Sequence, residues 1–188
     1  MIDSLNSIDT QLFLFLNHMH NSFFDFVMFW LSDKWVWTPM YIFIAVLIVW
    51  HYKKKGLLII LFIGLTITLC DQISSHLIKN LVERLRPSHE PLLIPLIHLS
   101  KAGAGGLYGF VSSHAANAFG LACFLGLVLN RKFRILKYWL FFWAILVSYS
   151  RIYNGVHYPS DVVVASIIGC IIAWSMSRIY ASYLAKYL

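Results

Sequence analysis

The segment from Ser150 to Asp161, SRIYNGVHYPSD, contains a histidine and a carboxylate that could work as a pair. His157 stands four residues before Asp161, and Pro159 between them favours the first position of a helix. A carboxylate one helical turn away can keep one imidazole nitrogen protonated and direct the other as a nucleophile. The segment therefore predicts an oriented, nucleophilic His157 with a cation, Arg151, close by in sequence.

Two further segments carry residues of the kinds that bind anions. Lys79 and Arg86 are seven residues apart in KNLVERLRP, nearly two turns of a helix, so both are expected on one helix face. Ser112 and Ser113 precede an apolar run, where hydroxyl groups and free backbone N–H groups at a helix N-terminus supply donors. Together with Arg151, these cations and donors suit a tetrahedral oxyanion such as phosphate.

The serine pair is followed by His114, in the segment VSSHAAN. With His157 as the nucleophile, His114 is free to act as a general acid for a leaving oxygen. Taken singly, each segment also has a structural explanation: snorkelling cations for KNLVERLRP, close helix packing for VSSHAAN, and a turn at Asn154 and Gly155 for SRIYNGVHYPSD. Their joint occurrence favours a catalytic anion site.

Membrane-spanning helices must position these residues. Of the 188 residues, 60% are apolar and 12% are charged, whereas soluble domains carry about 25% charged residues. This composition excludes disordered, collagen-like and coiled-coil proteins. Five runs are long and apolar enough to span a bilayer, and Pro87 is expected to stop the second. They cover approximately residues 36–52, 57–85, 113–129, 135–149 and 162–184.

The predicted fold class is accordingly an all-α, polytopic transmembrane helical bundle of five to six spans, forming a single domain over residues 1–188. Residues 1–35 are harder to assign, because polar side chains between Asn17 and Asp25 interrupt any window of about 20 apolar residues. Two short interfacial or re-entrant helices fit this pattern as well as one imperfect additional span does.

The distribution of cations predicts the orientation of the bundle. Nine of the fifteen Lys and Arg residues fall at one end of the predicted spans, which should be cytoplasmic. The three polar segments then meet at the opposite, extracytoplasmic mouth. The net charge of +7 mainly reflects this topology, with attraction to membrane lipids as a secondary effect, and nothing suggests nucleic acid binding. The nine residues are Lys53, Lys54, Lys55, Arg131, Lys132, Arg134, Lys137, Arg178 and Lys186.

The remaining reactive side chains suggest no second site. The cysteines are three, widely spaced and each within an apolar run, which predicts buried packing residues rather than a disulfide or redox motif. Asp71, two turns before Lys79, is expected to have a structural role. No metal site is predicted, because six histidines lack ligand spacing with carboxylates or cysteines: His18, His20, His51, His76, His89 and His98.

The three segments, which span residues 79–161, resemble the motifs of the type 2 phosphatidic acid phosphatase (PAP2) superfamily. The pattern KxxxxxxRP is matched by Lys79, Arg86 and Pro87. The pattern SRxxxxxHxxxD is matched by Ser150, Arg151, His157 and Asp161. The middle motif, PSGH in the family, is represented here by Val111, Ser112, Ser113 and His114, so two of its four positions depart.

The resemblance implies a role for each matched residue. Lys79, Arg86 and Arg151 would bind phosphate, and Ser112 and Ser113 would donate to it. His157 would form a phosphohistidine, Asp161 would orient it, and His114 would protonate the leaving group. No cofactor is implied, and the three fixed cations make a metal unnecessary.

The resemblance also implies a substrate class and a location. The expected activity is hydrolysis of a phosphate or diphosphate group from a membrane lipid at the periplasmic or exterior face of a bacterial inner membrane. Undecaprenyl diphosphate or a lipid A phosphate is favoured, with phosphatidylglycerol phosphate or phosphatidate as the alternative. Six spans with both chain ends in the cytoplasm are usual in the family, which favours a spanning element before residue 35.

An anion channel or transporter, with the cations as a selectivity ring, is the alternative of another class. The sequence shows no inverted repeat of the kind common in transporters. A channel would also leave the spacing of His157 and Asp161 without a purpose, so an enzyme is the better interpretation.

Overall fold

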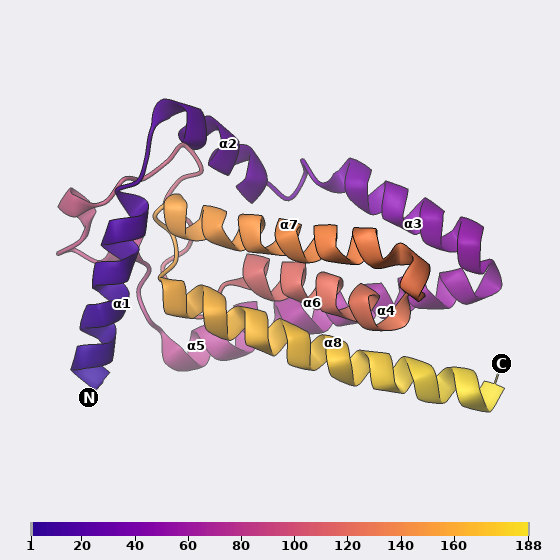
Figure 1. Cartoon of the computed structure of the whole chain (residues 1–188). Coiled ribbons are helices and arrows are strands. Elements are labelled where there is room, and N and C mark those ends of the chain that lie inside the picture. Colours follow the sequence, from indigo (N-terminus) through magenta and orange to yellow (C-terminus); the bar gives the residue numbers. More distant parts are fainter. Residues whose placement is uncertain (1, 188) are drawn as a thin grey trace.

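The computed structural model describes residues 2–187, and the regular secondary structure in this range is helical. Five helices lie side by side and form a bundle (Figure 1). This all-α architecture confirms the predicted fold class. Three continuous segments, 54–82, 131–153 and 159–186, are long and apolar enough to cross a membrane, and two bundle helices are shorter. The five are α3 (Thr38–Tyr52), α4 (Lys54–Asp71), α6 (Ser113–Val128), α7 (Arg134–Tyr153) and α8 (Pro159–Tyr187).

Helix α6 is at the centre of the bundle and packs against α8, α7 and α4. Small residues allow this close approach: a β-carbon at Gly169 of α8 would overlap the Ala116 carbonyl, and one at Gly120 would lie 2.8 Å from Sγ of Cys70. Cys70 is fully buried, as predicted, whereas Cys123 and Cys170 are only half-buried; all three are free thiols.

Residues 2–32 form two helices, α1 (Ile2–Asn17) and α2 (Ser22–Ser32), joined by a short turn. Helix α1 lies across one end of the bundle, while α2 packs against α7 (Figure 1). The Asn17 amide fixes this arrangement, because Nδ2 donates to the carbonyls of His98 (2.9 Å) and Tyr153 (2.8 Å). Of the two alternatives for this region, the structure follows the two-helix one. Both helices are shorter than the three long apolar segments, and α1 and the end of α8 lie at opposite ends of the bundle (Figure 1).

The second predicted span ends earlier than expected. Helix α4 continues through a π-helical segment, Gln72–Ile78, into the short helix α5 (Lys79–Val82). Glu83 then adopts a left-handed conformation with φ of 51°, and its N–H donates to the Lys79 carbonyl at the helix end.

Arg84 to Arg86 form an extended segment that pairs with Leu107 to Gly109. The Arg86 N–H donates to the Leu107 carbonyl (3.1 Å), and the Gly109 N–H donates to the Arg84 carbonyl (2.8 Å). Extended backbone is also what the following proline requires of Arg86. The prediction that Lys79 and Arg86 share one helix face is therefore wrong: Lys79 is helical, but Arg86 reaches the site from an extended strand-like segment.

The connection between α5 and α6 lies at the same end of the bundle as α1 and contains two 3₁₀ turns, Pro87–His89 and Ile94–Leu96. The opposite end holds the tight turn at Lys53 and the 3₁₀ turn Arg131–Phe133 (Figure 1). The basic connections and the three polar segments therefore lie at opposite ends, as their sequence positions predicted.

Candidate active site

The three polar segments meet at the end of the bundle that α1 crosses. They are the stretch from α5 into the extended segment, the N-terminus of α6, and the connection between α7 and α8 (Figure 1). A backbone hydrogen bond joins the last two, since the Ser112 N–H donates to the carbonyl of Asp161 (3.2 Å). The structure thus brings together residues that are up to 82 positions apart in the chain, from Lys79 to Asp161.

His157 and Asp161 form a buried pair. Nδ1 of His157 lies 3.4 Å from Oδ2 of Asp161, and the side chains are 1% and 0% exposed. The geometry arises locally, because Pro159 begins α8 and places Asp161 in its first turn. The Tyr158 N–H also donates to Oδ2 (2.9 Å). Nε2 is the ring nitrogen directed away from the carboxylate.

The electrostatic surroundings favour a neutral His157. Burial lowers the pKa of His157 well below its ordinary value of 6.5, and Arg86, Arg151 and Lys79 lower it further. A hydrogen bond with the Gly109 backbone opposes the shift without reversing it. The imidazole therefore stays unprotonated at neutral pH, which is the form a nucleophile needs.

Two arginines occupy different environments beside this pair. Arg86 is 7% exposed, and its Nε donates to the Tyr108 carbonyl (3.1 Å). Arg151 donates from Nη1 to the Ser32 hydroxyl, but its Nε is buried without a partner among the described residues. The Ser112 hydroxyl is likewise buried and unpartnered there. Buried donors normally have acceptors, so these two leave room for an anion.

Lys79 and His114 complete the group. Both histidines interact electrostatically with Lys79, which is half-buried on α5. His114 is the second residue of α6 and follows Ser113. Positive φ angles among non-glycine residues of the described range occur only at Lys53 and Glu83, so Ser113 has an ordinary backbone conformation. Serine is therefore compatible with this position, where the family motif has glycine.

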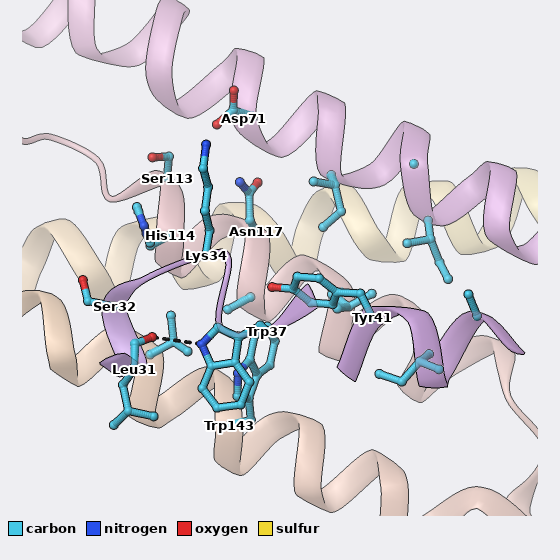
Figure 2. Close-up of a pocket in the computed structure, with 18 of the residues that line it drawn as sticks. Leu31, Ser32, Lys34, Trp37, Tyr41, Asp71, Ser113, His114, Asn117 and Trp143 are labelled. Atoms are coloured by element: carbon cyan, nitrogen blue, oxygen red, sulfur yellow. Dashed lines mark hydrogen bonds between the residues drawn. The ribbon is translucent and has the colours of Figure 1, made fainter. Parts of the chain in front are cut away.

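A cavity of about 670 Å³ adjoins His114 between α3, α4, α6 and α7. Its polar end is formed by Lys34, Asp71, Ser113, His114 and Asn117, and in Figure 2 the Lys34 side chain extends toward Asp71. Asp71, expected to be structural, accepts a hydrogen bond from the Ser75 hydroxyl (3.3 Å) and also lines this cavity. The rest of the lining is mainly apolar, including Ile44, Ile60, Ile63, Ile67, Leu121 and Val147.

Sequence spacing did not indicate that Arg84 contacts Asp161, or that Asp9 belongs to this end of the molecule. Arg84 donates to both Asp161 (3.0 Å) and Asp9 (2.8 Å). Asp9 is 75 residues away from Arg84 in the chain and lies on α1. A contact of that range leaves no periodic signal in the sequence.

The structure also brings together His20, Asp25 and His98, for which no ligand spacing was found in the sequence. Oδ1 of Asp25 accepts from His98 Nε2 (2.8 Å) and from the Tyr153 hydroxyl (2.8 Å). The two imidazole rings are stacked, with centroids 3.9 Å apart and planes 6° from parallel. A metal ion lies in the plane of each imidazole that binds it, and one ion cannot lie in the planes of two stacked, parallel rings. This geometry therefore indicates a hydrogen-bonded cluster rather than a metal centre.

The fold and the site define a helical membrane protein with a buried histidine–aspartate pair and three neighbouring cations at one end of its bundle. The sequence model of the PAP2 superfamily matches residues 56–183. The chain therefore belongs to the PAP2 superfamily, and it is a lipid phosphate phosphatase of the PAP2 type, a phosphoric monoester hydrolase.

Two curated relatives cover most of the chain. It is 43% identical over 176 residues to a lipid A 4'-phosphatase of Bacteroides thetaiotaomicron, covering 93% of this chain and 77% of that protein. It is 35% identical over 176 residues to a lipid A 4'-phosphatase of Porphyromonas gingivalis, covering 92% and 73%.

Two crystal structures have a similar fold. Aquifex aeolicus LpxE aligns with a TM-score of 0.64 and 26% identity, over 90% of this chain and 94% of LpxE. A PAP2-type phosphatidylglycerolphosphate phosphatase from Bacillus subtilis aligns with a TM-score of 0.68 and 22% identity, over 98% and 88%.

Proposed function

We propose that this protein hydrolyses the 4'-phosphate of lipid A at the extracytoplasmic face of the inner membrane, without a metal ion. The observation that carries the proposal is the buried, neutral His157 held by Asp161 and surrounded by three cations. The choice of substrate is supported by two relatives with the name lipid A 4'-phosphatase, at 43% and 35% identity.

The first chemical step is transfer of the phosphoryl group to His157. Lys79, Arg86 and Arg151 hold the phosphate oxygens. Nε2 of His157 attacks phosphorus, so that an N–P bond forms while the bond from phosphorus to the sugar oxygen breaks. His114 gives its proton to that leaving oxygen. Donors at the start of α6, from Ser112 and Ser113, stabilise the charge on the phosphoryl group.

The second step is hydrolysis of the phosphohistidine. His114, now neutral, accepts a proton from a water molecule whose oxygen attacks phosphorus. The N–P bond breaks, inorganic phosphate is released, and His157 returns to its starting form. Throughout, the Asp161 carboxylate accepts the Nδ1–H hydrogen bond, which keeps Nε2 directed at the substrate.

The cavity beside His114 supports a lipid substrate rather than a soluble sugar phosphate. Its apolar lining, from α3, α4, α6 and α7, accommodates hydrocarbon, and its polar end adjoins the histidine that would protonate the leaving group (Figure 2). A headgroup could therefore reach the site while part of an acyl chain remains in an apolar environment.

The charge distribution supports the orientation. Lys53–Lys55 and the Arg131–Lys137 region lie at the end of the bundle opposite to the site. Short cytoplasmic connections retain such positive charge, so the site would face the periplasm.

Phosphate release from a panel of lipids tests the substrate. Purified protein is incubated with lipid A bearing both phosphates, undecaprenyl diphosphate, phosphatidylglycerol phosphate and phosphatidate, with His157→Gln as the matched inactive variant. We expect preferential release from lipid A, with mass spectrometry locating the loss at the 4' position. Phosphate release mainly from another lipid would overturn lipid A as the proposed substrate. Phosphate release from none of the lipids would overturn the proposed activity.

A further inference from the structure

The protein itself holds the guanidinium group of Arg84 on three sides. Nη1 donates to Oδ1 of Asp161 (3.0 Å) and to the Ser160 hydroxyl (2.8 Å), and Nη2 donates to Oδ2 of Asp9 (2.8 Å). The carbon of the guanidinium lies 3.9 Å from the centroid of the Tyr158 ring. Because both terminal nitrogens are engaged, Arg84 is better placed to hold the site together than to bind phosphate.

The two oxygens of the Asp161 carboxylate have different partners. Oδ2 faces His157 and accepts the Tyr158 N–H, whereas Oδ1 accepts from Arg84. A carboxylate is planar, so fixing Oδ1 also fixes the direction in which Oδ2 points. Arg84 therefore sets the orientation of the group that aligns His157.

Asp9 connects this arrangement to α1. Its Oδ1 accepts the Ser160 N–H (2.9 Å), and its Oδ2 accepts from the Ser160 hydroxyl and from Arg84. Ser160 is the second residue of α8, where backbone N–H groups have no partner within the helix. Asp9 thus caps α8 from another helix, with its negative charge at the positive helix end.

We propose that Arg84 and Asp9 are positioning residues for the reaction of His157. Arg84 holds Asp161 in the orientation that aligns the imidazole, and Asp9 holds Arg84 and the start of α8. Because Asp9 lies on α1, docking of this crosswise helix is coupled to catalysis. The inference rests on the proposed phosphatase activity but concerns two residues that the matched motifs do not specify.

Steady-state kinetics of the purified full-length protein on lipid A test the role of Arg84. We expect Arg84→Met to lower kcat by about 10- to 100-fold, the effect of a small misalignment at a reacting centre, with little change in KM. Arg84→Lys should recover only part of this loss, since one ammonium group cannot hold Asp161, Ser160 and Asp9 together. Asp9→Asn should lower kcat less than Arg84→Met does. Arg178→Met, which removes an exposed cation elsewhere on α8, is the control and should retain wild-type rates.

A double-mutant cycle distinguishes positioning from general destabilisation. If Arg84 acts through Asp161, adding Arg84→Met to Asp161→Asn should lower kcat no further than Asp161→Asn alone. An unchanged kcat in Arg84→Met, or multiplying effects in the double variant, would overturn the inference. If Arg84→Met does not elute as a monodisperse protein in detergent, Arg84→Lys replaces it in the double-mutant cycle with Asp161→Asn. Absence of activity in the wild-type protein would instead overturn the proposed function.

Discussion

The guanidinium of Arg86 lies directly against Gly105, so that a β-carbon at Gly105 would be 2.6 Å from Nη1 of Arg86. Gly105 has φ of +71°, a conformation that glycine adopts without strain. The loop between α5 and α6 thus packs its bare backbone on one of the cations proposed to bind phosphate. Gly109 also lies against Arg86, since a β-carbon there would be 3.0 Å from Cγ of Arg86. In addition, Nε of Arg86 donates to the Tyr108 carbonyl.

A pair of glycine substitutions tests this packing. Gly105→Ala should displace the Arg86 guanidinium and lower kcat/KM by about tenfold or more, the loss that corresponds to one hydrogen bond to a charged group. Gly103→Ala is the matched control, because Gly103 also has a positive φ, of +79°, but has no atoms within 4 Å of an added β-carbon. Both variants carry backbone strain, so equal losses of kcat/KM would show that the Arg86 contact is unimportant.

Removing His157 and removing His114 should affect turnover in different ways. His157→Ala is expected to abolish turnover of every substrate, because no phosphoenzyme can form. His114→Ala should slow transfer from a lipid alcohol by about 10²- to 10⁴-fold, the usual contribution of a general acid. The same substitution should slow hydrolysis of p-nitrophenyl phosphate much less, because a phenolate leaves without needing a proton. Asp161→Asn should fall between the two.

Initial rates of these three variants on both substrates measure the difference, with monodisperse elution in detergent as the check on folding. Substantial activity in His157→Ala, or equal impairment of His114→Ala on both substrates, would require new assignments for the two side chains.

The protonation state of His157 can be measured directly. Since burial and the neighbouring cations lower its pKa well below 6.5, the ring should remain neutral as pH falls through 6.5, where an ordinary histidine gains its proton. NMR of protein labelled at histidine ¹³Cε1, with His157→Asn to assign the resonance, should show no titration of His157 between pH 8 and about 6.5. A midpoint at or above 6.5 would contradict the neutral-nucleophile assignment.

Activity is expected to persist when divalent metal ions are removed. Lys79, Arg86 and Arg151 supply fixed positive charge where a metal would otherwise stabilise the transferring phosphoryl group. Rates in excess EDTA should equal those without it. Loss of activity that only Mg²⁺ restores would argue for a metal in the reaction.

Labelling in intact cells tests the orientation. The three native cysteines are replaced by alanine. Single cysteines are placed at Ala102, in the exposed connection between α5 and α6, or at Lys54, at the exposed start of α4 at the other end of the bundle. An impermeant thiol reagent should modify the cysteine at 102 and not that at 54. The reverse pattern would place the site in the cytoplasm.

The sequence alone determined the features that depend on neighbouring residues. Spanning segments are recognisable because the length of an apolar run must match the thickness of the bilayer. The pair His157 and Asp161 is recognisable because its four-residue spacing, with Pro159 at the helix start, sets the geometry within one turn. The basic connections similarly predicted which end of the bundle holds the site.

Tertiary structure alone decided where the second span ends and how α1 lies. The span ends at Val82 because the segment from Arg84 to Arg86 pairs with residues 107–109, a contact that no local pattern encodes. Helix α1 crosses the end of the bundle because Asn17 and Asp9 form hydrogen bonds with residues more than 70 positions away. These are His98, in the connection between α5 and α6, and Ser160, at the start of α8. Hydrophobic periodicity reports which face of a helix is apolar, whereas the partners of its polar side chains are chosen only when distant segments meet.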